Sequence, residues 1–579
     1  MNNFLTVAPL LISSLLTLGS CSSGNKTSLQ ASDTIEGGQI KFDILRPVPS
    51  SLSTVHSRKF GMRSEAEDNT EAFRKALDYC HEHPGTRLVI DKGVYRFTES
   101  DKIRFKDIQT CLIDGREAEF IFAKTGVFMT IERCNCLEIK GLAIDVDRVA
   151  NPVDDVFRVA NANPEERTLD FVFFQKEDVD EDMIIQAITQ CDPETLTFGA
   201  KSSSKEHYIY MDPSILEKVE KTAPNVLSIT HNGALGRYAD GDTFIMRHHV
   251  YDGCVFNICG ETANLTFDGV KIYGSYGSGY GVGDLANHYQ IINSVIGIDP
   301  GDKTGAHVSL GADGIHIAGS GGYFYFAGCD ISAQGDDALN VHDGIGYVYE
   351  VDGNKIKMYS TQTRLNEGEA LAFKDTHFNE LGFSATITSF GNADDSRTGK
   401  VITFNKDVSA AIQPGCIAYS TVTDSGNYII RDNYFHENRA RALLLQSDNG
   451  LCENNVFYKV QGQAIKIVID IVTHLWQEGT GVKHLTVSNN MFDSCDYSGW
   501  GEQITIDTNI NYHHAECAVF KDINITDNEF KNFPKLVLNA MNVDGLKFTG
   551  NKIDKPDCIL LQSYCENTDI EGNVFDTGI

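Results

Sequence analysis

The sequence predicts an all-β fold, a parallel β-helix in which short strands coil into a solenoid. Three observations predict it: a repeated motif, the spacing of its copies and the amino-acid composition. In the last third of the chain, alternating apolar residues are followed by an Asn and then by an aromatic or aliphatic residue. The Asn positions of the six copies are Asn433, Asn455, Asn490, Asn528, Asn551 and Asn573.

Successive copies lie 22, 35, 38, 23 and 22 residues apart, counted from Asn433. A period near 22 without a helical pattern is typical of a solenoid coil, and the longer intervals fit one coil plus a loop. The repeated Asn side chains are expected to stack as an internal ladder of amides. The alternative, an ordinary β-sandwich or barrel, would require six accidental copies of the motif.

Composition agrees with this prediction. The chain has 579 residues, more than one compact core usually organises, with 51 Gly, 13 Pro and 41% hydrophobic residues. Its formal net charge of −31 repels phosphate backbones and anionic lipid headgroups, so no nucleic-acid partner is expected. The same charge weighs mildly against a polyanionic substrate.

The N-terminus predicts a targeting segment. Residues 4–18 are almost wholly apolar or small, too short to span a bilayer but suited to a signal peptide. They lead into Leu18-Gly19-Ser20-Cys21, which resembles a bacterial lipobox, although residues 1–13 contain no Lys or Arg. We therefore expect a signal peptide over 1–21, a lipid on Cys21, and a tether and entry segment over 22–60, with the flexible tether at 22–40. The expected location is the bacterial cell envelope, periplasmic or outer-membrane associated, with the lipid as the sole membrane contact. The alternative is a plain secretory signal with a coincidental Cys.

The next segment predicts a helix that covers the open end of the solenoid. Residues 68–80 carry apolar side chains at helical spacing, and Asp68 is the expected N-cap. Strands follow at 88–90 and 94–97. A cap is needed because an uncovered first coil would expose strand edges and core. Residues 61–149 are therefore expected to be the N-terminal part of the β-helix.

Two stretches, 150–245 and 346–425, lack the coil motif and show ordinary antiparallel signals. An example is the predicted hairpin of 347–351 and 355–359 around Gly353-Asn354. We predict two β-barrel domains inserted into the solenoid. Coils at 246–345 and 426–579 would lie between and after them, so that the barrels wall the region of 246–345.

Three aspartates in that region carry the predicted chemistry. Asp313 lies in Gly-Ala-Asp-Gly-Ile-His, and Asp336 and Asp337 lie in Gln-Gly-Asp-Asp-Ala-Leu-Asn. The interval of 23 residues from Asp313 to Asp336 is about one coil, so these carboxylates are expected to stack on neighbouring coils, with Gly335 at a bulge that turns both Asp336 and Asp337 outward. Paired carboxylates are the equipment of glycoside hydrolases, and crowding raises the pKa of one so that it can serve as an acid.

These motifs, the capping helix and the two insertions resemble glycoside hydrolase family 110, within the polygalacturonase-like β-helix clan. The resemblance implies a right-handed parallel β-helix. It also implies an exo-acting, inverting α-1,3-galactosidase without a cofactor or metal, acting on galactose-terminated oligosaccharides or glycoconjugates of blood group B or linear type. By the same resemblance, Asp313 is the general acid, and Asp336 and Asp337 activate water. The Gly-His-Gly and Arg-Ile-Lys motifs of pectinases are missing, which disfavours a uronate substrate.

Further residues on nearby coils are candidates for binding the sugar: His316, His342, Arg441, Gln446, Lys466 and Trp500. Two other functions stay open, a polygalacturonase-like or other polysaccharide-degrading β-helix enzyme and a non-catalytic glycan-binding adhesin. The sequence leaves open which of Asp336 and Asp337 is the principal base, whether fucosylated substrates are preferred, and the oligomeric state.

Overall fold

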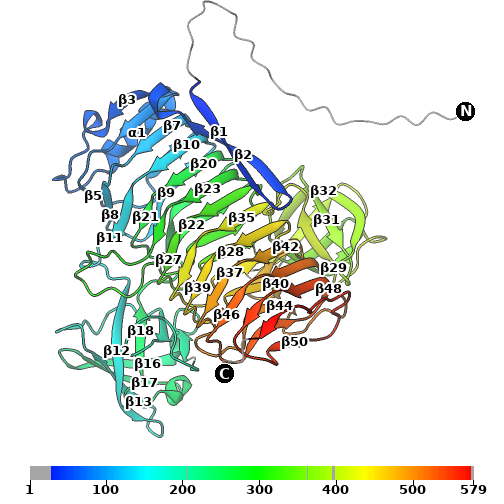
Figure 1. The fold of residues 1–579 in the computed structure, drawn as a ribbon. Helices are drawn as coiled ribbons and strands as arrows, with labels where there is room; N and C mark the ends of the chain where they lie inside the picture. Colours follow the sequence, from blue (N-terminus) through cyan, green and yellow to red (C-terminus); the bar gives the residue numbers. More distant parts are fainter. Residues whose placement is uncertain (1–27, 204, 362, 394–397, 576–579) are drawn as a thin grey trace, which may run out of the picture.

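The computed structural model describes residues 28–203, 205–361, 363–393 and 398–575. The predicted signal peptide and Cys21 lie outside the described residues. The chain forms a right-handed parallel β-helix with three long sheets, as predicted (Figure 1). Among the described residues, no helix is long and apolar enough to cross a membrane.

Each coil of the solenoid contributes one strand to each sheet, and neighbouring strands are parallel. Sheet I comprises β3 (Ser53–His56), β4 (Thr86–Val89), β7 (Gln109–Asp114), β10 (Asn135–Lys140), β20 (Ala263–Asp268), β23 (Asn287–Ile292), β26 (Phe324–Ala327), β35 (Tyr428–Arg431), β38 (Gly450–Glu453), β42 (Lys483–Ser488), β45 (Phe520–Thr526) and β48 (Val543–Thr549). Sheet II comprises β5 (Val94–Phe97), β8 (Glu119–Phe122), β11 (Ala143–Val146), β21 (Lys271–Ile272), β24 (Val295–Ile296), β27 (Asp330–Ser332), β36 (Tyr434–His436), β39 (Val456–Tyr458), β43 (Met491–Asp493), β46 (Glu529–Lys531), β49 (Lys552–Ile553) and β51 (Val574–Phe575). Sheet III comprises β6 (Ile103–Lys106), β9 (Gly126–Glu132), β19 (Gly253–Cys259), β22 (Ser278–Gly283), β25 (Ile315–Ala318), β28 (Leu339–His342), β37 (Leu443–Leu445), β40 (Ile465–Val472), β44 (Glu502–Ile510), β47 (Leu536–Ala540) and β50 (Ile559–Leu561), and β41 (Trp476–Glu478) pairs antiparallel with β40.

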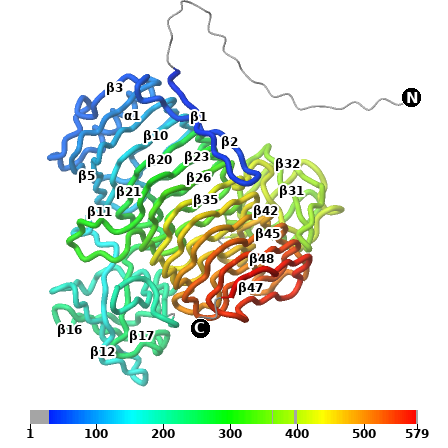
Figure 2. The backbone as a smooth tube through the Cα atoms, viewed as in Figure 1, coloured from blue at the N-terminus to red at the C-terminus, as the bar shows by residue number. Residues whose placement is uncertain are grey.

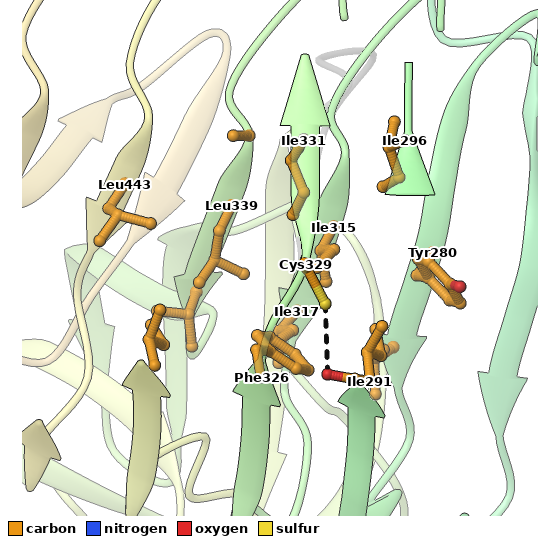
Figure 3. Packing of buried hydrophobic residues seen from close by; sticks show 14 of the residues in the cluster. Tyr280, Ile291, Ile296, Ile315, Ile317, Phe326, Cys329, Ile331, Leu339 and Leu443 are labelled. Atoms are coloured by element: carbon orange, nitrogen blue, oxygen red, sulfur yellow. Dashed lines mark hydrogen bonds between the residues drawn. The ribbon is translucent and has the colours of Figure 1, made fainter. Parts of the chain in front are cut away.

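The core lies between the three sheets and is filled by inward-pointing apolar side chains. Ile315 and Ile317 of β25 pack beside Leu339 of β28, and all three are at most 1% exposed (Figure 3). The buried thiol of Cys329 donates to the carbonyl of Ile291 at 3.5 Å, which satisfies a polar group inside the core. Alternate residues of each strand therefore point outward and are free to build a site.

The predicted Asn ladder is present at the turns from sheet I to sheet II. The side-chain amide of Asn433 donates to Oδ1 of Asn455 at 3.0 Å, and Asn455 donates in the same way to Asn490. The ladder continues through Asn528, Asn551 and Asn573. Each Oδ1 also accepts the backbone N–H of the preceding Asn, so the buried amides satisfy one another from coil to coil.

The capping helix is α1 (Thr70–Glu82), which begins at the N-cap Asn69 and not at the predicted Asp68. Asp68 instead accepts the backbone N–H of Thr70 and of Thr98, which joins the helix to the chain after β5. Phe73 of α1 packs against Phe97, Phe105 and Phe120 with ring centroids 5.2–6.1 Å apart. The helix therefore seals the first coil. Short 3-10 turns η1 (Pro49–Ser51) and η2 (Ser57–Phe60) precede it.

The flexible tether expected over 22–40 is wrong for residues 30–40, which are ordered. Residues 30–47 form an antiparallel hairpin, β1 (Gln30–Gly37) and β2 (Ile40–Pro47), that lies across the outer face of sheet I (Figure 1). Phe42 and Ile44 pack there with Ile429 and Leu451, and Arg46 pairs with Glu138. The alternation of Ile40, Phe42 and Ile44 was the signal that this segment is ordered.

The first insert comprises β12 (Asp154–Asn163), β13 (Thr168–Phe173), β14 (Ala187–Gln190), β15 (Glu206–Tyr208), β16 (Leu216–Ala223), β17 (Val226–His231) and β18 (Thr243–Arg247), with 3-10 turns η3 (Pro213–Ile215) and η4 (Ala234–Arg237). The predicted closed barrel is wrong here. The strands form one open antiparallel sheet whose edge strands, β15 and β16, do not pair with each other. The physical reason lies at β15: its Glu206 binds Arg439 of the solenoid, so this edge faces the coils and does not close a barrel.

The second insert is a closed barrel of β29 (Ile345–Asp352), β30 (Lys355–Tyr359), β31 (Ala370–Lys374), β32 (Glu380–Asn392), β33 (Gly399–Phe404) and β34 (Ile417–Ser420). The second insert connects β28 of sheet III to β35 of sheet I, whereas the first connects β11 of sheet II to β19 of sheet III. The two inserts therefore stand on different sides of the solenoid (Figure 2). The barrel contacts the later coils through Lys374, which donates to the carbonyl of Thr480, and through Thr398, which donates to Thr473.

Candidate active site

The three aspartates lie in the turns between sheet II and sheet III. Asp313 precedes β25, and Asp336 and Asp337 precede β28. Ile315 pairs with Leu339, two residues after Asp313 and Asp337, so it is Asp337 that is in register with Asp313. The expected stacking of Asp336 on Asp313 is therefore displaced by one residue. Asp336 and Asp337 both belong to the turn, where the alternation of a strand does not separate them.

Asp313 and Asp337 are buried, with 4% and 1% of their surface exposed. Oδ1 of Asp313 accepts the backbone N–H of Asp337 at 3.1 Å, and Oδ2 is bonded to Nδ1 of His316 at 2.7 Å. Asp337 accepts the backbone N–H of Arg441 at 3.0 Å and its guanidinium at 2.7 Å. Arg441 follows Asp337 in register on the next coil, because Leu339 pairs with Leu443.

Asp336 is bound by residues outside the row of Asp313, Asp337 and Arg441, which are in register on successive coils. Arg439 donates to its Oδ1 at 2.7 Å and also donates to Glu206 of the first insert at 3.0 Å. The hydroxyl of Tyr251 donates to Oδ2. Tyr251 has a positive φ of 60°, as many residues at the turns of this solenoid do, and it lies just before β19. Each of the six carboxylate oxygens of the aspartates thus accepts one donor from the protein.

The three carboxyl groups cannot all ionise cheaply, because their nearest oxygens lie within 4.8 Å of one another. Burial raises the pKa of Asp336 well above its ordinary value, and the charges of Asp337 and Asp313 add to this effect. Burial also raises the pKa of Asp337 to about 6, although Arg441 opposes it. The pKa of Asp336 is raised in spite of its ion pair with Arg439, because the positive charge of Arg439 is shared with Glu206. The cluster therefore keeps a proton near neutral pH.

A metal ion does not suit this cluster well, although the three carboxylates are close enough to hold one. Arg439 and Arg441 already place two positive charges on Asp336 and Asp337, and a cation would displace or be repelled by them. The donor set favours acid–base chemistry of the carboxyl groups.

Among the candidates for sugar binding, His316 and Arg441 reach the aspartates. His342 does not reach a sugar, because it is fully buried, and its Nε2 lies 3.4 Å from Nε2 of His316. Gln446 is also fully buried, and its side-chain amide donates to Glu478 at 3.0 Å. Both side chains lie inside the protein behind the aspartates, where they contact other residues of the protein and not a sugar.

Lys466 and Trp500 lie on later coils. Lys466 is partly exposed on the outer face of sheet III, 3.8 Å from Asp507, in register with Leu444. Trp500 packs on the chain before β40: a Cβ added to Gly462 would lie 2.4 Å from its indole ring. Trp500 is therefore a packing residue in this structure, whereas Lys466 keeps an exposed amino group in line with the cluster.

Sequence reasoning missed the residues that the first insert supplies. Arg247 of β18 is 1% exposed, and its Nη1 donates to the carbonyls of Gly311 and Gly335 at 3.0 and 2.6 Å. A Cβ on Gly335 would lie 2.4 Å from that nitrogen, so glycine is required there. Arg247 thereby holds together the two turns that carry the aspartates. No periodicity marks Arg247, Tyr251 or Glu206, and only the isolated Gly335 gave a signal.

A cavity of about 940 Å³ lies elsewhere, on sheet I beside the tip of the hairpin β1–β2, where Lys41, His484 and Asn524 are among its lining residues. It contains none of the aspartates. We favour the aspartate cluster because perturbed, converging carboxyl groups indicate chemistry more strongly than volume does.

No protein-family model matches the chain. It is 23% identical to α-1,3-galactosidase A of Shewanella woodyi, over 88% of this chain and 87% of the relative. It is 24% identical to α-1,3-galactosidase A of Bacteroides fragilis (strain YCH46), over 81% and 79% of the two chains. It is 23% identical to α-1,3-galactosidase B of Bacteroides thetaiotaomicron, over 85% of each.

Solved structures with a similar course of the chain include a polygalacturonase from Erwinia carotovora, with 11% identity, a TM-score of 0.38, and coverage of 90% of this chain and 93% of that one. A family 28 exopolygalacturonase from Yersinia enterocolitica has 10% identity, a TM-score of 0.33, and coverage of 92% and 81%. Similarity at this level carries no functional conclusion. The sequence relatives are named α-1,3-galactosidases, and the resemblance to these enzymes that the aspartate motifs predicted is confirmed over most of the chain.

Proposed function

We propose that this protein is an exo-acting glycoside hydrolase that removes terminal α-1,3-linked galactose from glycans. The observation that carries the proposal is the buried cluster of Asp313, Asp336 and Asp337, in which every carboxylate oxygen has a donor. Relatives named α-1,3-galactosidases match the chain on both sides of these motifs. The substrates would be galactose-terminated oligosaccharides or glycoconjugates, of the blood group B type or linear.

The cluster favours a neutral sugar over a uronate. Arg439 and Arg441, the guanidinium groups on the aspartates, are both paired with carboxylates of the protein. A substrate carboxylate would have to displace one of these pairs, which costs an unpaired buried charge. This supports galactose and disfavours the polygalacturonase-like alternative.

The roles of the three aspartates can be assigned in two ways. The resemblance assigns the acid to Asp313 and the activation of water to Asp336 and Asp337. The contacts in the free site favour a proton on Asp336, because Asp313 accepts from His316 and from a backbone N–H, both of which stabilise its ionised form. Both assignments use the same three groups and predict different variant kinetics, which are given in the Discussion.

Inversion at the anomeric carbon is part of the proposal and rests on the resemblance. The nearest carboxylate oxygens lie within 4.8 Å of one another, closer than the roughly 6.5–9.5 Å typical of inverting pairs. Proton NMR of the first product decides the matter: β-galactose is expected before mutarotation, and α-galactose would show retention.

The function itself is tested by incubating the purified protein with an α-1,3-linked galactobiose, with polygalacturonate and with a chelator. Release of galactose that survives the chelator and is lost in Asp337→Asn is the expected result. Cleavage of polygalacturonate alone would favour the pectinase-like enzyme, and binding of the disaccharide without cleavage would favour an adhesin.

We also propose that the protein is anchored in the cell envelope by a lipid on Cys21, on the strength of the lipobox at residues 18–21. Cys21→Ala is expected to release the protein from the membrane fraction or to block its maturation. Membrane fractionation identical to that of the unaltered protein would rule the anchor out.

A further inference from the structure

Behind Asp313, three titratable side chains lie in a row that we call the file: His316, His342 and Glu478. The proposed reaction does not use them. Nδ1 of His316 is 2.7 Å from Asp313, and Nε2 of His316 is 3.4 Å from Nε2 of His342. The same nitrogen of His342 lies 3.8 Å from a carboxylate oxygen of Glu478. His342 is 0% and Glu478 8% exposed, so this file runs into the protein and away from any sugar.

The two facing Nε2 atoms share one proton if they are hydrogen-bonded, because the bond needs one N–H and one free lone pair. Burial lowers the pKa of His342, the charge of Glu478 opposes this and the charge of His316 adds to it, which favours a neutral ring. In the tautomer of His342 whose lone pair is at Nε2, His316 donates from both ring nitrogens, to Asp313 and to His342, and is an imidazolium.

The charge of the cluster agrees with this assignment. Arg441 pairs with Asp337, and Arg439 is shared between Asp336 and Glu206. With the proton of the cluster on Asp336, the carboxylate of Asp313 is left without a guanidinium, and the imidazolium of His316 balances its charge. Asp313 is the aspartate whose side chain is paired with no arginine among the described contacts, and it is the one bonded to His316.

Glu478 is itself held in place. Its second carboxylate oxygen accepts from Gln446 at 3.0 Å. Its backbone forms a β-bridge with Gly344, the residue before β29, where the barrel begins. The base of the second insert therefore fixes the far end of the file.

We propose that His342 and Glu478 are positioning residues that hold His316 as the imidazolium partner of Asp313, and so set the charge state of Asp313. This inference rests on the proposed function only for its effect on catalysis. The arrangement of charges that it describes exists in the protein without substrate and is tested there.

The expected pH dependence follows from the groups that face His316: Asp313, Asp337, His342 and Glu478. Burial lowers the pKa of His316, but the hydrogen bond and charge of Asp313, with the charges of Glu478 and Asp337, raise it to about 9. His316 is therefore charged below pH 9 and loses its proton above it. The alkaline limb of kcat/KM should fall near this pH, and removing the charge of Glu478 should move the limb to lower pH.

The experiment is an NMR titration of the His316 ring in the purified, substrate-free protein, with His316→Gln to assign the signal. Glu478→Gln should lower the midpoint by about half a pH unit to one unit, because a direct opposite charge is worth about 1–3 units and Glu478 acts through one ring. Asp470→Asn is the matched control, since Asp470 is the cross-strand partner of Glu478 and binds Asn509. Its midpoint should stay unchanged.

An unchanged midpoint in Glu478→Gln, or a neutral His316 at pH 7 in the unaltered protein, overturns the inference. Should Glu478→Gln fail to fold, His342→Leu serves instead, because it removes the acceptor of His316 and should lower the same midpoint. In active protein, the alkaline limb of kcat/KM should shift with the midpoint. Protein that shows the expected titration and releases no galactose would refute the proposed function and leave the file of charges intact.

Discussion

The two inserts meet the aspartate cluster in different ways. The first is an open sheet, and its edge strand β15 and last strand β18 supply Glu206 and Arg247 directly to the solenoid turns. The second is a closed barrel: among the described residues its strands pair with one another, and Gly344, just before β29, bridges to Glu478. An open sheet has unpaired edge strands to lend to a site, whereas a closed barrel has no edge strand. The first insert therefore contributes side chains that position the aspartates, whereas the second contacts Glu478, which lies behind them.

The variants with the largest expected effect test whether Asp313 or Asp336 is the general acid. Asp336 is bound by Tyr251 and by Arg439, which Glu206 of the first insert also binds, and Asp313 is bound by the file that ends at the second insert. Asp313→Asn and Asp336→Asn should each lower kcat/KM for an α-1,3-galactoside by about 10²–10⁴-fold. On a nitrophenyl galactoside, the variant that lacks the acid should lose far less, because that leaving group needs little protonation. Equal losses on both substrates in both variants would leave Asp337 as the acid.

Arg247→Met should come next. It removes a buried charge and two hydrogen bonds to carbonyls, each worth about 1.5–3 kcal/mol when the donor is charged. We expect the free energy of unfolding to fall by about 3 kcal/mol in urea and kcat to fall about 10–100-fold, with KM little changed. Arg158→Met, on an exposed position of the same insert, is the control and should stay within about 0.5 kcal/mol. If both variants behave alike, the first insert does not position the aspartates.

Tyr251→Phe should have a smaller effect, about tenfold on kcat/KM, the value of one charge-assisted hydrogen bond. The sign of its pH effect is defined. The bond from Tyr251 lowers the pKa of Asp336, so its loss raises that pKa and moves the limb of kcat/KM that Asp336 governs to higher pH, the acidic limb if Asp336 is the base and the alkaline limb if it is the acid. Tyr512→Phe, at an 80% exposed position, should leave the profile unchanged. A limb that moves to lower pH would contradict the assignment of the donor.

The smallest effect is expected in the barrel. Lys374 is almost buried and donates to the carbonyl of Thr480. Lys374→Met should lower the free energy of unfolding by about 1 kcal/mol and kcat/KM by less than about threefold, because it loosens a brace and touches no aspartate. Denaturation in urea and steady-state kinetics measure both. A loss of activity as large as that of Arg247→Met would erase the distinction between the inserts.

The periodic features could be predicted from the sequence. The Asn ladder, the capping helix and the coil-to-coil placement of the aspartates all repeat at the spacing of the coil, and periodicity is visible in a single chain. The predicted pairing of Asp313 with Asp336 was wrong by one residue, because the interval from Asp313 to its partner Asp337 is set by the length of a turn. A repeat fixes strands better than it fixes the turns between them.

The contributions of the inserts could not be predicted. Arg247, Tyr251 and Glu206 belong to no repeat, and their place at the site depends on how a separate sheet packs against the coils. Closure of a sheet depends on whether its two edge strands meet, which alternation of apolar residues does not encode. The burial of His342 was missed for a related reason: its neighbours Gln446 and Glu478 come from later strands of the same sheet.

The hairpin β1–β2 has a consequence for the order of events at the ribosome. Its apolar residues Phe42 and Ile44 pack with Ile429 and Leu451, which are synthesised roughly four hundred residues later. The hairpin also lies on β10, β20 and β23, which are made earlier, but at about 5–20 residues per second it waits on the order of 20–80 s before the last part of its docking surface exists. Completion of its packing onto sheet I is therefore a late step, which joins an early part of the nascent chain to coils that have only just formed.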